Sequence, residues 1–298
     1  MNNTNTDKLK EQVRDFWNRQ SCDTNFARAP KFSRDYFEQI EAYRYGDQPF
    51  IHSFAQFTRY HGKKVLEVGF GAGTDFIQWL RAGAIASGID LTPGGLDHLK
   101  NRIEVYHLPT PETIQVADAE HLPFESDSFD LGYSFGVLMC CPDTELAIKE
   151  LVRVIRPGGH FKIMLYNRYS ICAINQWGKH AAGRGRPWKS ISWVLWHYME
   201  SIGTKAHSRK ELRRIFAQLP LTDVRVETFV TSGDQYAACR IPPLNWLYRM
   251  LIRLAGTLVA YRNPDFARKR RRPLRSDGVE FSGNPLGWFH CISAIKEG

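Results

Sequence analysis

Apolar residues recur along this chain with two different periods. Short apolar runs are typical of buried strands, whereas longer segments with an apolar residue every three or four positions are typical of amphipathic helices. The short runs predict strands over residues 63–69, 84–91, 113–117, 129–135, 160–166, 224–231 and 288–296. The longer period predicts helices over residues 7–17, 74–83, 92–106, 143–155 and 208–219. Strands that alternate with helices predict a mainly parallel sheet with helices on both faces.

Local signals mark the ends of two of these helices. Asp143 can cap the start of one helix, and Arg156-Pro157-Gly158-Gly159 stops it. Ser208, followed three residues later by Glu211, predicts a capping box at the start of another.

Three segments fall outside the alternation. Residues 1–60 are rich in aromatic side chains and predict an N-terminal arm, which either packs on the core or closes over a ligand pocket. Residues 167–207 and 232–287 are irregular and predict two insertions in a domain that covers residues 61–298. The first insertion contains a cluster of tryptophans: Trp177, Trp188, Trp193 and Trp196.

A turn with three glycines joins the first predicted strand of the alternation to its helix. Gly69, Gly71 and Gly73 allow positive φ and let a ligand lie against bare backbone, which predicts an adenosine-type cofactor. The spacing GxGxG, with Thr74 next, departs from the GxGxxG of dinucleotide folds. Glu67 just before the turn would repel a pyrophosphate at the helix N-terminus and suits a ligand with an amino group and a sulfonium.

The segment Glu67-Val68-Gly69-Phe70-Gly71-Ala72-Gly73 resembles motif I of class I S-adenosylmethionine-dependent methyltransferases, of the small-molecule type 11/25 kind. Four further motifs follow in register over residues 61–166: Asp90 in Gly88-Ile89-Asp90-Leu91, Asp118-Ala119, Ser134-Phe135-Gly136 and Arg156-Pro157-Gly158-Gly159. This resemblance implies a Rossmann-like, doubly wound sheet of seven strands, with the last strand antiparallel and helical or loop insertions as a cap.

The resemblance also implies roles for the matching residues. The backbone of Gly69, Gly71 and Gly73 would line the methionine part of the cofactor, with Glu67 holding hydrogen bonds there. Asp90, next to Leu91, would accept hydrogen bonds from the ribose hydroxyls in a bidentate arrangement. Asp118 and Ala119 would lie beside the adenine, and Ser134 and Gly136 beside the amino-acid end.

A general base for the acceptor is not assigned by any motif. Met139 and Cys140 stand where related quinone methyltransferases carry two histidines, so that base is not available here. Buried, inert thiols are the favoured interpretation of Cys140 and Cys141. The catalytic residues stay unknown, with weak candidates in Tyr45, Tyr166, Arg168 and His197. Other lone histidines are His52, His180, His207 and His290, each more often structural.

Composition adds limits on class and partners. The 298 residues carry a formal net charge of +9, with a pI near 9.3, which favours an acidic partner or an acidic group on the acceptor unless it serves solubility alone. The six cysteines lack zinc-site spacing, which predicts no metal site and reduced thiols in the cytoplasm. Neither a secretory signal nor a membrane-spanning run is expected.

Two basic features follow in the second insertion. Residues 244–261 are long and apolar, with Arg249 and Arg253 on one face, and residues 268–275 form a basic cluster. A cap helix with a solvated loop is the favoured interpretation, and peripheral contact with an anionic membrane is the alternative. No RNA-binding module accompanies the cluster, so nucleic acid is not the favoured partner. The oligomeric state is left open.

These observations predict methyl transfer from S-adenosylmethionine to a small apolar or aromatic molecule, at oxygen in preference to carbon or nitrogen. The first alternative is an RNA or protein methyltransferase that uses the cluster at residues 268–275. The second is a scaffold or regulatory subunit that binds S-adenosylmethionine without catalysis.

Overall fold

A computed structural model describes residues 3–231, 234 and 278–298 of the chain. Its helices are α1 (Asn3–Arg19), α2 (Arg34–Asp47), α3 (Phe50–Ala55), α4 (Phe76–Arg81), α5 (Pro93–Val105), α6 (Thr144–Val154), α7 (Ile171–His180), α8 (Ile191–Tyr198) and α9 (Arg209–Phe216). Its strands are β1 (Lys64–Val68), β2 (Ile85–Asp90), β3 (Thr113–Val116), β4 (Phe129–Phe135), β5 (Ile155–Tyr166), β6 (Leu221–Phe229), β7 (Val279–Gly283) and β8 (Phe289–Lys296).

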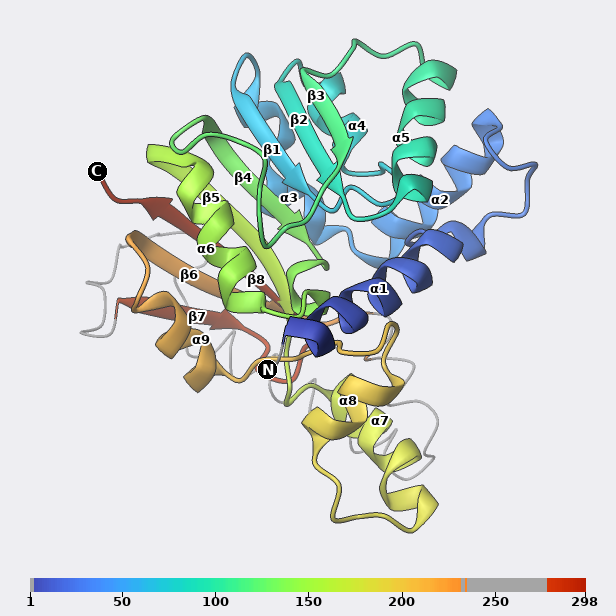
Figure 1. Cartoon of the computed structure of the whole chain (residues 1–298), viewed down its shortest axis with the longest axis vertical. Coiled ribbons are helices and arrows are strands. Elements are labelled where there is room, and N and C mark those ends of the chain that lie inside the picture. Colours follow the sequence, from blue (N-terminus) through green and yellow to red (C-terminus); the bar gives the residue numbers. More distant parts are fainter. Residues whose placement is uncertain (1–2, 232–233, 235–277) are drawn as a thin grey trace, which may run out of the picture.

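The described strands form one sheet in the order β3-β2-β1-β4-β5-β8-β6-β7 (Figure 1). Neighbouring strands in the segment β3-β2-β1-β4-β5 pair in parallel, and β8 runs antiparallel to both β5 and β6. This confirms the predicted Rossmann-like sheet with an antiparallel last strand. The predicted count of seven strands is wrong, because β7 adds an eighth strand at the edge through parallel pairing with β6.

The predicted start of β5 is also wrong. The strand begins at Ile155, where it pairs with Phe129, and not at His160. The turn-like residues Arg156–Gly159 are therefore included in the strand, as an irregularity in its register with β4. The expected helix stop at this place is nevertheless real, since α6 ends at Val154.

The local capping signals hold. The side chain of Asp143 accepts a hydrogen bond from Leu146 N, 3.0 Å away, at the start of α6. Ser208 and Glu211 form both hydrogen bonds of the predicted capping box at the start of α9. These contacts satisfy amide groups that a helix start leaves without partners.

The buried core lies between the sheet and its helices. Four of the five β1 residues are buried, and α4 packs there through Phe76, Ile77 and Trp79, none of which is exposed. A strand buried on both faces is typical of a parallel sheet. The core holds β1, β2, β4 and β5 at a fixed register, so their carboxyl ends meet at one edge.

Helix α1 lies across this edge, and α7 and α8 project beyond it from the first predicted insertion (Figure 1). Among the residues described, no helix has both the length and the apolar character needed to span a bilayer. The predicted features at residues 244–261 and 268–275 lie outside the described residues.

Candidate functional site

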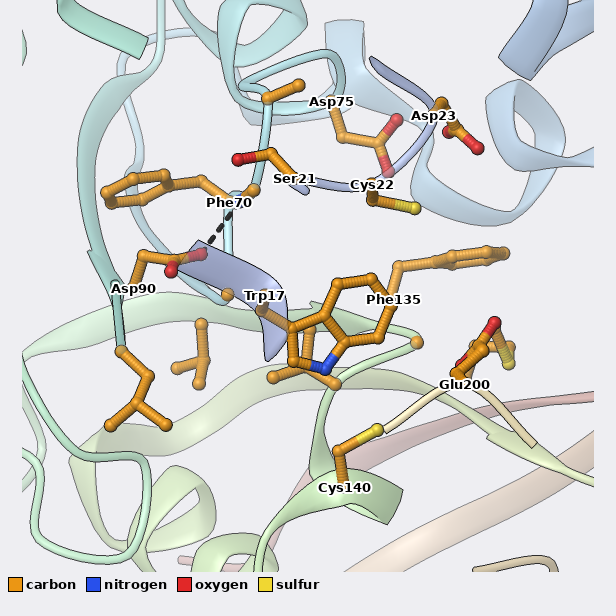
Figure 2. A pocket seen from close by; sticks show the side chains of 18 of the residues that line it. Trp17, Ser21, Cys22, Asp23, Phe70, Asp75, Asp90, Phe135, Cys140 and Glu200 are labelled. Atoms are coloured by element: carbon orange, nitrogen blue, oxygen red, sulfur yellow. Dashed lines mark hydrogen bonds between the residues drawn. The ribbon is translucent and has the colours of Figure 1, made fainter. Parts of the chain in front are cut away.

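A cavity of about 450 Å³ opens at the carboxyl ends of β1, β2, β4 and β5 (Figure 2). Its wall also includes residues of α1 and α2, the loop between them, and residues 199–200 and 288–289. Parallel α/β sheets place their ligands at this edge. In Figure 2, Asp90 and Glu200 lie on opposite sides of the view, with Trp17 and Phe135 between them.

The three glycines of the turn after β1 all have positive φ, at +81°, +53° and +75°. A Cβ on Gly69 would lie 2.3 Å from Val137 Cγ2, and a Cβ on Gly73 would lie 2.8 Å from Leu99 Cδ1. Gly69 and Gly71 line the cavity, whereas Gly73 is outside its lining. Glycine is therefore required at 69 and 73 by backbone conformation and by space.

The carboxylate of Asp90 holds this turn in place. Its Oδ2 accepts a hydrogen bond from Gly71 N at 2.8 Å, and its Oδ1 accepts two from Thr92, from N at 2.9 Å and Oγ1 at 2.7 Å. Burial raises the pKa of Asp90, although these hydrogen bonds act in the opposite direction. Since a carboxylate oxygen accepts about two hydrogen bonds, Oδ2 keeps one position for a ligand hydroxyl. The predicted bidentate arrangement would need Thr92 to give up a hydrogen bond.

Lys10 of α1 reaches across the cavity edge to two acids that follow β3. Its Nζ forms ion pairs with Asp118 and, at 2.7 Å, with Glu120. Asp118 Oδ1 also accepts a hydrogen bond from Glu120 N at 2.9 Å. Helix α1 is thus fastened over the position where the adenine is expected, a contact that the sequence motifs did not indicate.

Glu67 lines the cavity from β1 and is buried. Its Oε2 accepts a hydrogen bond from Trp79 Nε1 at 2.7 Å. Burial and the nearby charge of Asp75 raise the pKa of Glu67 well above its ordinary value. A cationic ligand group nearby would stabilise the ionised form of this carboxyl.

Asp75 lies under the glycine turn and is held by three residues. Arg44 of α2 donates to its two oxygens at 2.9 and 2.7 Å, while the hydroxyls of Tyr133 and Tyr45 donate at 2.9 and 3.1 Å. Burial alone would raise the pKa of Asp75, but Arg44 and the hydrogen bonds hold it below its ordinary value. Arg44 also pairs with Asp23 at 3.3 Å. This network joins the N-terminal arm to the turn.

The other residues expected at the cofactor lie in two environments. Leu91, Ala119 and Gly136 line the cavity. Ser134 is fully buried outside the lining, and its Oγ donates to Val68 O at 2.8 Å. The structure therefore places Ser134 as a link between β4 and β1.

The four weak catalytic candidates do not all lie at the cavity. Tyr166, at the end of β5, lines the cavity, whereas Tyr45, Arg168 and His197 do not. Arg168 donates to Ala206 O and pairs with Glu211 at 2.8 Å. The Nδ1 of His197 lies 2.7 Å from Trp193 O on an exposed surface. No histidine is included in the cavity wall formed by the described residues.

Glu200 is the functional candidate that the sequence did not reveal. The hydroxyl of Tyr166 donates to Glu200 Oε1 at 2.9 Å and to Oε2 at 3.0 Å. Glu200 is an exposed residue that lines the cavity. Desolvation of its carboxyl and the charge of Asp23 nevertheless exceed the effect of the Tyr166 hydrogen bond and raise the pKa of Glu200 to about 7. Glu200 belongs to no motif and lies in a loop after α8, so only the fold brings it to β5.

The wall around Tyr166 and Glu200 is apolar. The ring of Tyr166 stacks on that of Trp288, with centroids 4.2 Å apart and planes at 18°. The remaining neighbours in this part of the cavity wall include Phe135, Met164, Cys172 and Phe289. A planar or apolar molecule fits such a surface.

The adjacent thiols of Cys140, which is buried, and Cys141, which is partly buried, both lie in this wall. Burial raises the pKa of Cys140 to about 11 and raises the pKa of Cys141 further. Both side chains therefore stay protonated near neutral pH, in agreement with the inert interpretation. The five cysteines of the described residues are free, and Cys239 lies outside them.

Comparison with protein families gives one match. Residues 66–163 match the family model described as "Methyltransferase domain". The matched segment contains the glycine turn, Asp90, Asp118 and β4, and it ends inside β5. Tyr166 and Glu200 lie outside it.

Among curated proteins, the "Probable phthiotriol/phenolphthiotriol dimycocerosates methyltransferase 2" of Mycobacterium ulcerans (strain Agy99) is 38% identical over 102 residues, which are 34% of this chain and 38% of that protein. The "Malonyl-[acyl-carrier protein] O-methyltransferase" of Erwinia billingiae (strain Eb661) is also 38% identical over 102 residues, with the same two shares. The match thus spans little more than a third of the length of these curated relatives.

Solved structures resemble the whole fold. Geranyl diphosphate C-methyltransferase from Streptomyces coelicolor A3(2) has a TM-score of 0.55 at 14% identity, over 97% of each chain. Magnesium protoporphyrin IX methyltransferase from Synechocystis PCC 6803 has a TM-score of 0.54 at 12% identity, over 97% of this chain and 100% of that chain. At these identities the likeness concerns the fold alone.

Proposed function

We propose that this chain, which carries an S-adenosylmethionine-dependent methyltransferase domain over residues 66–163, transfers a methyl group to a hydroxyl of a small, neutral, apolar or aromatic acceptor. The observation that supports this proposal is that one continuous cavity extends from the glycine turn and Asp90 to the aromatic wall at Tyr166. Both substrates would meet at the carboxyl ends of β4 and β5.

The residues at one end of the cavity fit the cofactor. Gly69 and Gly71 present bare backbone, Asp90 Oδ2 has room for a ribose hydroxyl, and Asp118 would accept from the adenine amino group. S-adenosylmethionine supplies an activated methyl group on a sulfonium. The part of the protein is then to position the acceptor and exclude water.

Charge in the cavity favours a neutral acceptor. Lys10 and Arg44 are the cations in the wall formed by the described residues, and both are paired with acids. An acidic group on the acceptor would therefore find no free cation in this part of the wall. The positive net charge favoured an acidic group on the acceptor, whereas the paired cations of the cavity wall favour a neutral acceptor.

The N-terminal arm is proposed to cover the substrates. Lys10 fastens α1 to Asp118, and Arg44 of α2 holds the turn from below through Asp75. The segment 167–207 supplies Glu200 and Cys172 to the other wall, which supports its proposed role as an acceptor-side insertion. The same role for residues 232–287 rests on the sequence pattern. Thr231, the residue just before this segment, lies in the cavity wall.

Transfer to oxygen is supported by the Tyr166–Glu200 pair and by the name of one relative, which is an O-methyltransferase. The RNA or protein alternative depends on residues 268–275, and the membrane contact depends on the same cluster with residues 244–261. Both segments lie outside the described residues. A measurement of catalytic turnover distinguishes the scaffold alternative from the proposed enzyme.

The first test is binding of S-adenosylhomocysteine, the demethylated product of the cofactor, measured by calorimetry. Asp90→Ala should weaken binding by about tenfold to a hundredfold, since a hydrogen bond to a charged group contributes about 1.5–3 kcal/mol. Asp97→Ala, which removes an exposed acid on α5, is the matched control and should bind normally. Equal affinity in all three proteins would contradict the assigned cofactor site.

The second test is turnover. The protein is incubated with methyl-labelled S-adenosylmethionine and a fractionated cell extract, and mass spectrometry identifies compounds that gain one CH₂. Labelling of a neutral hydroxyl compound supports the proposal. Binding of the cofactor without any labelled compound would support the scaffold alternative. Labelling of RNA or protein would support the RNA or protein methyltransferase alternative.

A further inference from the structure

We infer that Glu200 is the general base of the reaction, that Tyr166 positions it, and that the acceptor is a phenol whose hydroxyl proton is taken by the Glu200 carboxylate. This inference rests on the proposed function, because it names the base and the acceptor class of the same site. The carboxyl end of β5 and the loop after α8 bring the two residues together across 34 positions of sequence.

The first argument is geometric. The hydroxyl of Tyr166 is shared between both oxygens of Glu200, at 2.9 and 3.0 Å, which fixes the carboxylate beside the aromatic part of the cavity wall. Four lone-pair positions belong to a carboxylate, and one donor occupies only part of them. The remaining positions face a cavity where an acceptor hydroxyl can donate.

The second argument is the absence of a compensating cation among the described residues. Asp75 and Asp23 share Arg44, and Asp118 pairs with Lys10, whereas no ion pair joins Glu200 to a described residue. A carboxyl without such a partner holds a proton more readily than a paired one, as a base near neutral pH must.

The third argument is backbone strain. Glu200 has φ at +39°, a conformation that side chains with a Cβ rarely adopt. Such strain costs on the order of 1–3 kcal/mol and tends to occur at functional sites. Glu200 shares this feature with Asp23, which has φ at +65° and also lines the cavity.

The charges around Glu200 set the direction of its titration. Glu200 contacts the Tyr166 hydroxyl and interacts electrostatically with the Asp23 carboxylate and the thiols of Cys22, Cys140 and Cys172. Burial and Asp23 raise the pKa of Glu200, and Tyr166 lowers it, to about 7. The base form therefore increases as pH rises through neutrality.

The proposed step balances as follows. The phenol O–H bond breaks and its proton passes to a Glu200 oxygen. The phenol oxygen forms a bond to the methyl carbon, while the carbon–sulfur bond breaks and its electron pair stays on sulfur as a neutral thioether. The aromatic wall, with Trp288 stacked on Tyr166, would hold the phenol ring.

The test compares two phenols of different acidity. The phenol 4-methylphenol has about the pKa of a tyrosine side chain, near 10, whereas 4-nitrophenol ionises near neutral pH without help. In Glu200→Gln, methylation of 4-methylphenol should fall by about 10²–10⁴-fold, while 4-nitrophenol should lose much less. The rise of the wild-type rate through pH 7 should disappear. Equal losses on both phenols, or no loss, would overturn the inference.

Three further measurements separate the possible failures. Infrared difference spectra of the protein alone should show a carboxyl that titrates near neutral pH and is missing in Glu200→Gln. Tyr166→Phe should move the rising limb of the pH profile to higher pH, since Tyr166 lowers the pKa of Glu200. Glu104→Gln, at an exposed site on α5, is the matched control and should behave as wild type.

Binding of S-adenosylhomocysteine decides which proposal fails. Glu200→Gln should bind it as the wild type does, because Glu200 lies away from Asp90 in the cavity. Wild-type binding without methylation of either phenol would overturn this inference and leave the proposed function standing. A wild-type protein that does not bind S-adenosylhomocysteine would overturn both.

Discussion

Arg44→Met should destabilise the protein by leaving a buried carboxylate without its cation. Arg44 donates two hydrogen bonds to Asp75, at 2.9 and 2.7 Å, and the Asp75 side chain is only 2% exposed. Methionine replaces the aliphatic part of the side chain and removes the charged guanidinium. The perturbation therefore isolates the electrostatic part of the contact between the arm and the glycine turn.

The magnitude follows from burial. Loss of one partner of a buried ion pair costs about 3–5 kcal/mol. Tyr133 and Tyr45 still donate to Asp75 in the variant, so the lower end of the range, about 3 kcal/mol, is expected. That is a large part of the roughly 5–15 kcal/mol by which proteins are folded. Arg34→Met removes an exposed pair with Glu38, at 3.0 Å, and should cost at most about 1 kcal/mol.

The assay is urea unfolding of the wild type, both single variants and the double variant Arg44→Met/Asp75→Asn. The double variant should recover part of the loss, because the amide carries no charge to bury. The pH dependence has a definite sign. Arg44 holds the pKa of Asp75 below its ordinary value. The pair therefore stabilises the fold above that ordinary pKa, and the stabilisation is lost as pH falls through the lowered pKa. The difference between wild type and Arg44→Met should therefore shrink in acid.

The reasoning is refuted if Arg44→Met costs no more than Arg34→Met at neutral pH. It is refuted as well if the double variant is no more stable than Arg44→Met, because the cost would then come from lost packing and not from the stranded charge. A difference in stability that stays constant down to acid pH leads to the same conclusion.

Two further substitutions test the cofactor end of the cavity. Gly69→Ala places a Cβ 2.3 Å from Val137 Cγ2 at φ +81°, so it should lower stability by about 1–3 kcal/mol and weaken S-adenosylhomocysteine binding in calorimetry. Gly62→Ala, with a φ of +68° and nothing within 4 Å, is its control for strain alone and should bind normally. Lys10→Met removes the ion pairs to Asp118 and Glu120, so it should speed dissociation of S-adenosylhomocysteine in stopped-flow measurements and increase amide exchange in α1. An unchanged dissociation rate would show that Lys10 does not retain the ligand.

The elements that sequence predicts well depend on residues close together in the chain. Strand β4 spans the predicted residues 129–135, and the capping box at Ser208 needs only a residue three positions away. Strand β7 could not be predicted in this way. Val279 pairs with Val224 of β6, 55 positions earlier, and short polar segments become strands only when a partner edge is present.

The same distinction divides the candidate site. Gly71 and Asp90 belong to motifs with fixed spacing, and they meet through a hydrogen bond of 2.8 Å. The ion pair of Lys10 with Asp118 joins residues 108 positions apart, and no motif marks Lys10. Glu200 has no local signal at all, since its role depends on its hydrogen bonds with Tyr166, 34 positions earlier. A sequence pattern can thus locate the cofactor end, whereas the acceptor end depends on tertiary contacts.

The net charge of the whole chain is positive, whereas the cavity wall has more acidic than basic side chains. The chain carries a formal charge of +9, yet its described cavity wall contains two basic side chains, Lys10 and Arg44, against seven acidic ones: Asp23, Asp47, Glu67, Asp75, Asp90, Asp118 and Glu200. Long-range attraction acts on encounter and is screened by salt over about 10 Å, whereas burial acts on the bound molecule. An anionic acceptor would lose its hydration against an acidic wall, and a phenol would not. The positive charge therefore bears on what approaches the protein, and the cavity decides what it binds.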